Sequence, residues 1–191
     1  MAAPAVDISV DPETGTWTTD GLPMLYVPRH FLMGLLRTVR DAIGAAAADA
    51  QFYAAGHEAA ERWCAAQAER LGLSGIAVFH FYMQRLSERG WGMFDGSGID
   101  PATGTGRVLL RHSAFVADAG ITGTRVCAFC TGWAPGALAW VGRSQARNWR
   151  LRGEEVHCAS EGHGICEILV TQQTDADGCD ETAATRLPAG A

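Results

Sequence analysis

Apolar side chains in the N-terminal half of the chain recur with the period of an α-helix. A first helix is predicted to begin at Pro28 and to end near Gly44, since apolar residues fall there every three or four positions. These residues are Leu32, Leu35, Leu36, Val39 and Ile43. A second helix is predicted over residues 45–71, where small residues are frequent and would let another helix approach closely. A third is predicted over residues 76–89, with an alternation at its start that also fits a strand.

The pattern changes to that of β-strands after Gly90. Apolar and β-branched residues come there in short runs, which segments rich in glycine, proline and aspartate separate. The predicted elements are strands over residues 91–94 and 107–116, a helix over 131–147, and strands over 148–158 and 165–172. This order predicts an α+β fold, in which N-terminal helices are followed by a small antiparallel sheet packed on helices.

The two ends of the chain differ in composition from the middle. Residues 1–20 are predicted to form a flexible arm, because turn-forming residues are frequent there. Residues 173–191 are predicted to form a flexible tail, rich in Thr, Asp, Gly and Ala. The ordered part divides into a helical segment over residues 21–74 and a second part over residues 75–172.

Composition and charge restrict the class of partner. The chain has 191 residues, a net charge of −6 and no basic run, which argues against nucleic acid and against an anionic membrane surface. No apolar run approaches the roughly 20 residues that span a bilayer, and the N-terminus lacks the apolar stretch of a signal peptide. We therefore expect a cytoplasmic protein whose cysteines are metal ligands or buried thiols rather than disulfides.

Residues 155–166 concentrate groups that bind metals. They hold two carboxylates, two thiols and two imidazoles, and two glycines let the backbone turn around them. Thiolates combined with a harder nitrogen or oxygen ligand suit zinc best. In one interpretation Cys127, Glu155, Cys158 and Cys166 bind zinc tetrahedrally. Four protein ligands leave no open position, so such a site would be structural rather than catalytic.

Two other interpretations of this cluster stay open on spacing alone. In the second, all four ligands are local, namely His157, Cys158, His163 and Cys166. Adjacent residues on a strand point to opposite faces, which counts against this set. In the third, the cysteines are ordinary buried thiols and the histidines lie at the surface.

Three segments resemble the vinyl-4-reductase domain family. Residues 127–136 carry its pattern of Cys, four residues, Gly, an aromatic residue, two residues and Gly. Residues 155–166 carry its closing pattern of Glu, Cys, Gly and a final Cys followed by a strand. Residues 111–115 resemble its strand with a central Ser. The resemblance extends over about residues 75–172, which would make this part a vinyl-4-reductase-type domain.

The resemblance implies a fold like that of trafficking-complex (TRAPP) subunits and a structural zinc held by Cys127, Glu155, Cys158 and Cys166. It also implies ligand binding, since domains of this family form the sensory part of phenol- and xylene-responsive transcription activators. The chain lacks the phosphate-binding loop of the activators' ATPase, so we expect a stand-alone domain. Leu110 stands where phenol sensors carry a tryptophan, so a ligand other than a phenol is expected.

Aromatic residues are the candidates for the wall of a pocket that contacts a small apolar or aromatic molecule. They are Phe79, Phe81, Tyr82, Trp91, Phe94 and Trp133. Each of them, taken singly, also fits a plain hydrophobic core. With the implied zinc site, these residues predict a domain that binds a small, mostly apolar ligand as a sensor or carrier.

Two other classes of function compete with ligand binding. The alternative is a non-catalytic accessory or assembly subunit of a catabolic enzyme complex, which acts through protein contacts. An enzyme ranks last, because the sequence holds no nucleotide or flavin motif and the implied metal site is closed. A homodimer is also predicted, from the fold analogy and from the small residues over 47–71.

Overall fold

The computed structural model describes residues 6–173. Residues 1–5 of the predicted arm and 174–191 of the predicted tail lie outside the described residues. The strands are β1 (Ser9–Val10), β2 (Trp17–Thr19), β3 (Leu22–Met24), β4 (Met93–Ile99), β5 (Gly106–Arg111), β6 (Leu151–His157) and β7 (Cys166–Gln172). The helices are α1 (Arg29–Ile43), α2 (Ala45–Leu71), α3 (Ile76–Glu88), α4 (Ala114–Ala119) and α5 (Ala128–Ser144), with a 3-10 turn η1 (Ala159–Glu161).

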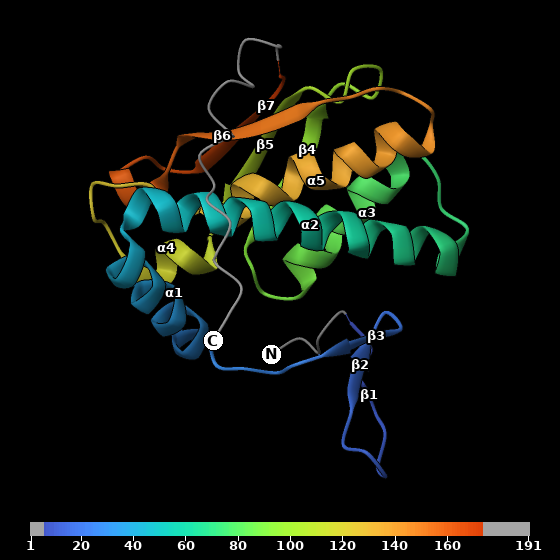
Figure 1. The fold of residues 1–191 in the computed structure, drawn as a ribbon, viewed down its shortest axis with the longest axis horizontal. Helices are drawn as coiled ribbons and strands as arrows, with labels where there is room; N and C mark the ends of the chain where they lie inside the picture. Colours follow the sequence, from blue (N-terminus) through green and yellow to red (C-terminus); the bar gives the residue numbers. More distant parts are fainter. Residues whose placement is uncertain (1–5, 174–191) are drawn as a thin grey trace, which may run out of the picture.

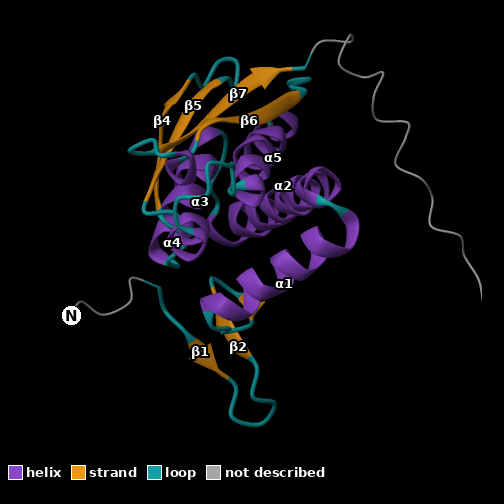
Figure 2. Cartoon of the chain, turned by 90° about the vertical axis from the view of Figure 1, so that its left-hand side faces the viewer, coloured by secondary structure: helices purple, strands orange, loops and turns teal. Residues whose placement is uncertain are grey.

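A four-stranded antiparallel sheet with the order β4-β5-β7-β6 covers one side of the helices (Figure 1). Figure 2 shows α3 and α5 directly beneath this sheet, α2 beneath α5, and α1 and α4 farther from it. The centre of the core lies between the sheet and the first helix layer, where Leu110, Ile168, Phe79 and Leu138 are fully buried. The predicted α+β fold, with a sheet packed on helices, is confirmed.

Glycines bring α2 and α5 into close contact. A Cβ atom on Gly132 would lie 2.2 Å from the carbonyl oxygen of Tyr53, and one on Gly136 would lie 2.3 Å from that of His57. Only residues without a side chain allow the two helix backbones to lie this close together. The predicted close approach of a helix to residues 45–71 is therefore confirmed. Because α5 of the same chain occupies this surface, the small residues of α2 no longer support the homodimer, which stays a prediction.

The region around His112 differs from its predicted structure. The strand predicted over residues 107–116 ends at Arg111, because the backbone of His112 has φ +55° and leaves the sheet. Ser113 then caps α4, its hydroxyl accepting a hydrogen bond from the amide of Phe115 at 3.3 Å. The apolar residues that follow the cap fit a strand and a buried helix equally well, and only the turn decides between them.

The N-terminal segment has more regular structure than the predicted arm. A turn over residues 11–16 joins β1 to β2, and β2 pairs with β3. The side chain of Asp20 is 6 % exposed and forms ion pairs with Arg89 at 2.7 Å, Arg85 at 3.3 Å and Arg70 at 3.6 Å. These partners belong to α2 and α3 or follow directly after α3, so Asp20 attaches the small sheet to the helical body.

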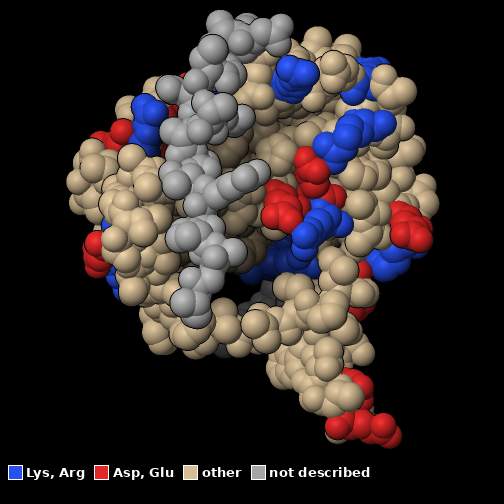
Figure 3. Space-filling model, viewed as in Figure 1, with Lys and Arg blue, Asp and Glu red and all other residues tan. Residues whose placement is uncertain are grey.

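Charges of both signs are mixed on the surface of the protein. On the face shown in Figure 3, acidic and basic side chains lie beside one another over the helices. Many are paired, as are Arg143 with Glu61 and Arg62 with Glu58. Over residues 6–173, no helix combines the length and the apolar character that crossing a bilayer requires.

Candidate metal centre and a neighbouring cavity

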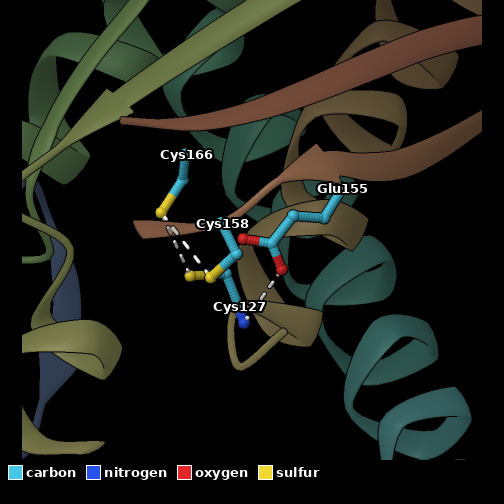
Figure 4. Close-up of side chains that lie close together, drawn as sticks. All are labelled: Cys127, Glu155, Cys158 and Cys166. Carbon is cyan, nitrogen blue, oxygen red and sulfur yellow. Dashed lines mark hydrogen bonds between the residues drawn. The ribbon is translucent and has the colours of Figure 1, made fainter. Parts of the chain in front are cut away.

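Cys127, Glu155, Cys158 and Cys166 converge at one buried point (Figure 4). One ligand atom from each lies within 4.8 Å of the others. Cys127 is the residue before α5, Glu155 is in β6, Cys158 follows β6 directly, and Cys166 begins β7. The group therefore joins the first turn of α5 to the last two strands.

A β-bulge places two of these ligands on the same face of β6. Glu155 lies opposite Ile168 and His157 lies opposite Glu167, so that Val156 is an extra residue in the strand. Glu155 is buried and His157 is exposed, and the next residue, Cys158, returns to the buried side.

The sulfur atom of Cys166 lies close to those of Cys127 and Cys158 and accepts a backbone hydrogen bond. The Sγ of Cys166 lies 3.9 Å from that of Cys158 and 3.9 Å from that of Cys127. The amide of Ala159, in the turn η1, donates a hydrogen bond to the Cys166 sulfur at 3.3 Å. Hydrogen bonds from the neighbouring thiols, that of Cys127 first, lower the pKa of Cys158 below its ordinary value. The cluster thus favours a thiolate at this position.

Glu155 supplies the oxygen of the set. Its Oε2 accepts a hydrogen bond from the amide of Cys127 at 3.2 Å, whereas its Oε1 is buried without a hydrogen-bond partner among residues 6–173. Burial raises the pKa of this carboxyl group to about 8. A buried acceptor that lacks a hydrogen-bond donor is unfavourable unless a cation binds to it instead. Three sulfur atoms and one such oxygen could hold a thiophilic metal ion.

The two histidines of this stretch lie outside the group. The rings of His157 and His163 are 4.5 Å apart, and Nδ1 of His157 is 3.3 Å from a carboxylate oxygen of Glu167. The side chain of His157 is 49 % exposed. Of the interpretations that spacing left open, the structure therefore assembles the ligands of the first and not the local set.

Three of the six predicted pocket aromatics lie together. The ring centroid of Trp133 is 5.1 Å from that of Trp91 and 6.0 Å from that of Phe94. Phe115 and Phe129 extend this group, each with its centroid 6.3 Å from that of Trp133. These five rings form one aromatic cluster between α5, α4 and the start of β4.

The other three predicted aromatics lie elsewhere in the core. Tyr82 and Phe81 pack on Trp63, with ring centroids at 4.9 and 5.5 Å. Phe79 is fully buried, and its ring lies so close to Gly96 that a Cβ there would be 2.6 Å away. The structure thus separates the three predicted residues of α3 from the three that lie together around Trp133.

A cavity of about 330 Å³ lies between α1, α2, α4 and the start of α5, at the low end of the range for ligand pockets. Its apolar lining consists chiefly of Met33, Leu36, Phe52, Phe115, Val126 and Phe129. None of the six predicted pocket residues lines it. Two of its walls, Phe115 and Phe129, nevertheless belong to the aromatic cluster. Trp91 and Trp133 pack directly behind these two rings, and Phe94 packs on Trp133.

The polar side of this cavity comes from α1 and α4. Nη1 of Arg37 is 2.6 Å from Oδ2 of Asp118, and Nε of Arg40 is 2.9 Å from Oδ1 of Asp49. The guanidinium of Arg40 also lies over the ring of Phe52, 5.9 Å from its centroid. The sequence held a signal that the prediction missed. Positions 33, 36, 37 and 40 share one helix face, and two arginines lie on it beside apolar residues.

The helix-backed antiparallel sheet, which carries the buried group of three thiols and one carboxylate at one end, defines a TRAPP-like α+β fold. The chain belongs to the family of the domain of unknown function DUF5943, whose pattern matches residues 2–97, half of the chain. The matched part ends in β4, before the four clustered residues. No curated protein matches the chain.

Solved structures share this fold. The phenol-responsive sensory domain of the transcription activator PoxR, determined with phenol, has a TM-score of 0.70 at 19 % identity, over 86 % of this chain and 84 % of its own. A vinyl-4-reductase family protein from Methanocaldococcus jannaschii has a TM-score of 0.50 at 13 % identity, over 79 % and 85 %. A trafficking protein particle complex subunit 3 from Naegleria fowleri, covalently bound to palmitic acid, has a TM-score of 0.50 at 14 % identity, over 76 % and 95 %.

Proposed function

We propose that this protein is a zinc-stabilised domain that binds a small, mostly apolar molecule as a sensor or carrier and does not catalyse a reaction. The observation that carries the proposal is the likeness to the phenol-sensing domain of PoxR, which extends over 86 % of the chain. The likeness at 19 % identity is one of fold, so the ligand has to be argued from this chain's own residues. The cavity beside α1 offers the space.

Zinc is the metal that the donor set favours. Three thiols and one carboxylate suit zinc, and four protein ligands saturate a tetrahedral ion, which leaves none of its positions for a substrate. In this role the ion would cross-link α5, β6 and β7. The energy of metal binding would then be part of the folding energy of the C-terminal half.

The aromatic residues would serve ligand binding by supporting the cavity wall. Trp91 stacks on Phe115 with centroids 5.9 Å apart, and Trp133 packs against both Phe115 and Phe129. Phe94 completes this layer through Trp133. The other three predicted pocket residues, Phe79, Phe81 and Tyr82, are kept as candidates for a second, inner part of the pocket.

A second candidate function rests on a different observation. The segment that contains α1 exposes large apolar side chains, which on a soluble protein often mark a contact with another protein. They are Leu25 (87 % exposed), Tyr26 (76 %), Phe31 (60 %), Leu35 (52 %) and Ile43 (50 %). This surface favours an accessory or assembly subunit, and it is also where the predicted homodimer could form.

Native mass spectrometry of the full chain, purified from its own host, separates these functions. The proposed function predicts one zinc per chain and an additional small-molecule mass that denaturation releases. A stoichiometric second polypeptide without any small molecule would instead favour the accessory subunit. A chain that carries neither zinc nor a small molecule would refute the proposed function.

A further inference from the structure

We propose that the cavity beside α1 takes a molecule with an apolar body and an anionic head, most simply a carboxylate that Arg37 and Arg40 bind. The inference rests on the proposed function and names the class of ligand and the residues that recognise it. It follows from three features of the cavity: its stacked rings, its charges and its hydroxyl groups.

The apolar side of the cavity is formed mainly by three aromatic rings that are stacked on one another. The rings of Phe52 and Phe129 are stacked, with centroids 5.4 Å apart and planes at 13°. Phe115 continues the stack, with its centroid 6.3 Å from that of Phe129 and planes at 17°. Met33 and Leu36 of α1 add aliphatic side chains to the lining. A flat ring or a short alkyl chain could bury its surface against these apolar atoms.

The charged groups of the lining include the guanidinium groups of Arg37 and Arg40. Each of them pairs with one carboxylate, Arg37 with Asp118 and Arg40 with Asp49. Arg37 donates to Asp118 through Nη1 alone. Arg40 donates to Asp49 through Nε and Nη2. The guanidinium group has five N–H donors, so each arginine keeps donors that can bind a second carboxylate.

The hydroxyl groups of the lining are engaged with one another. Oγ1 of Thr122 lies 2.8 Å from Oγ of Ser160 and 3.0 Å from Oγ1 of Thr124. A ligand that bonds to these hydroxyl groups would therefore have to break bonds within this loop. The two arginines are the donors best placed for a ligand, and a charge-assisted bond to a carboxylate is roughly twice as strong as a neutral one.

The test compares matched pairs of probes on the purified full chain with its metal in place. The pairs are 3-phenylpropionate with 3-phenylpropionamide and octanoate with octanamide, and affinity is measured by isothermal titration calorimetry. We expect at least one carboxylate to bind about ten- to a hundredfold more tightly than its amide. Arg37→Gln and Arg40→Gln should each remove most of this preference.

Two further variants separate the cavity from the arginines. Ala119 lies in the cavity lining but is exposed, so Ala119→Phe should fill the cavity without disturbing the core and should abolish binding of both probes. Arg62→Gln is the matched control, because Arg62 is 80 % exposed on α2 and pairs with Glu58 outside the cavity lining. It should leave every affinity unchanged.

Three results would overturn the inference. In the first, carboxylate and amide bind equally and Ala119→Phe abolishes both, which leaves the proposed function intact. In the second, a carboxylate binds but neither arginine variant weakens it. In the third, no probe binds, and mass spectrometry of the host protein then decides the proposed function separately.

Discussion

Glu155 in β6 and Cys158 directly after it are three residues apart, and both are buried, because Val156 is an extra residue in the strand. In a regular strand, residues three apart point to opposite faces. The bulge therefore brings together the carboxylate and the thiol that the metal proposal requires.

Replacing Cys166 with serine should remove the metal and destabilise the domain. We expect zinc to fall from about one per chain towards zero, and the free energy of unfolding to fall by more than about 2 kcal/mol. Elemental analysis and thermal unfolding measure the two effects. Cys64→Ala is the control, because Cys64 is buried in α2 outside the cluster and its loss should leave the zinc in place. Full zinc retention in Cys166→Ser would refute the assignment.

Replacing Glu155 with glutamine should weaken metal binding, while the side chain keeps nearly the same volume in the core. A neutral amide is a poorer donor to a dication, so we expect the affinity for zinc to fall at least about tenfold. Competition with a chelator of known affinity measures this change. Glu154→Gln is the matched control, since Glu154 is the preceding residue and its side chain is 67 % exposed. Equal affinities in the two variants would exclude Glu155 as a ligand.

Alanine at Gly132 should destabilise the protein, although alanine is the better helix former. Its Cβ would lie 2.2 Å from the carbonyl oxygen of Tyr53, so α2 and α5 would have to separate, at a cost of about 1–3 kcal/mol. Gly34→Ala is the matched control, because Gly34 is also inside a helix but has open space around it. There the free energy of unfolding should rise by about 0.5–1 kcal/mol. Denaturant unfolding measures both, and stabilisation by Gly132→Ala would contradict the packing.

Asparagine at Asp20 should release the N-terminal sheet. The substitution removes the buried carboxylate that pairs with Arg70, Arg85 and Arg89, and such a loss costs about 3–5 kcal/mol where the pair is fully buried. Limited proteolysis should then cleave within β1 to β3 faster than in the parent protein. Glu13→Gln, in the exposed turn between β1 and β2, should not change the rate. An unchanged rate in Asp20→Asn would show that other contacts hold this sheet.

Local pattern was sufficient for the long helices. The helix predicted over residues 45–71 has the same bounds as α2, since its sequence favours a helix throughout and a glycine follows its last residue. Cys127, Glu155, Cys158 and Cys166 could be singled out only through the resemblance to the vinyl-4-reductase family, because spacing alone left three interpretations of the cluster open. The pattern failed where one backbone angle decides, as at His112, whose positive φ turns a predicted strand into α4.

The sequence by itself determined the class of fold and the extent of the long helices, because these depend on local period, and its resemblance to a family pointed to the four residues that could hold a metal. Only the tertiary structure decided how distant residues meet. Met33 and Phe129 line one cavity although 96 positions (129 − 33) separate them, and Asp20 finds its arginines 50 to 69 positions (70 − 20 and 89 − 20) away. Such contacts depend on how α1, α2 and α5 pack, which no local pattern contains.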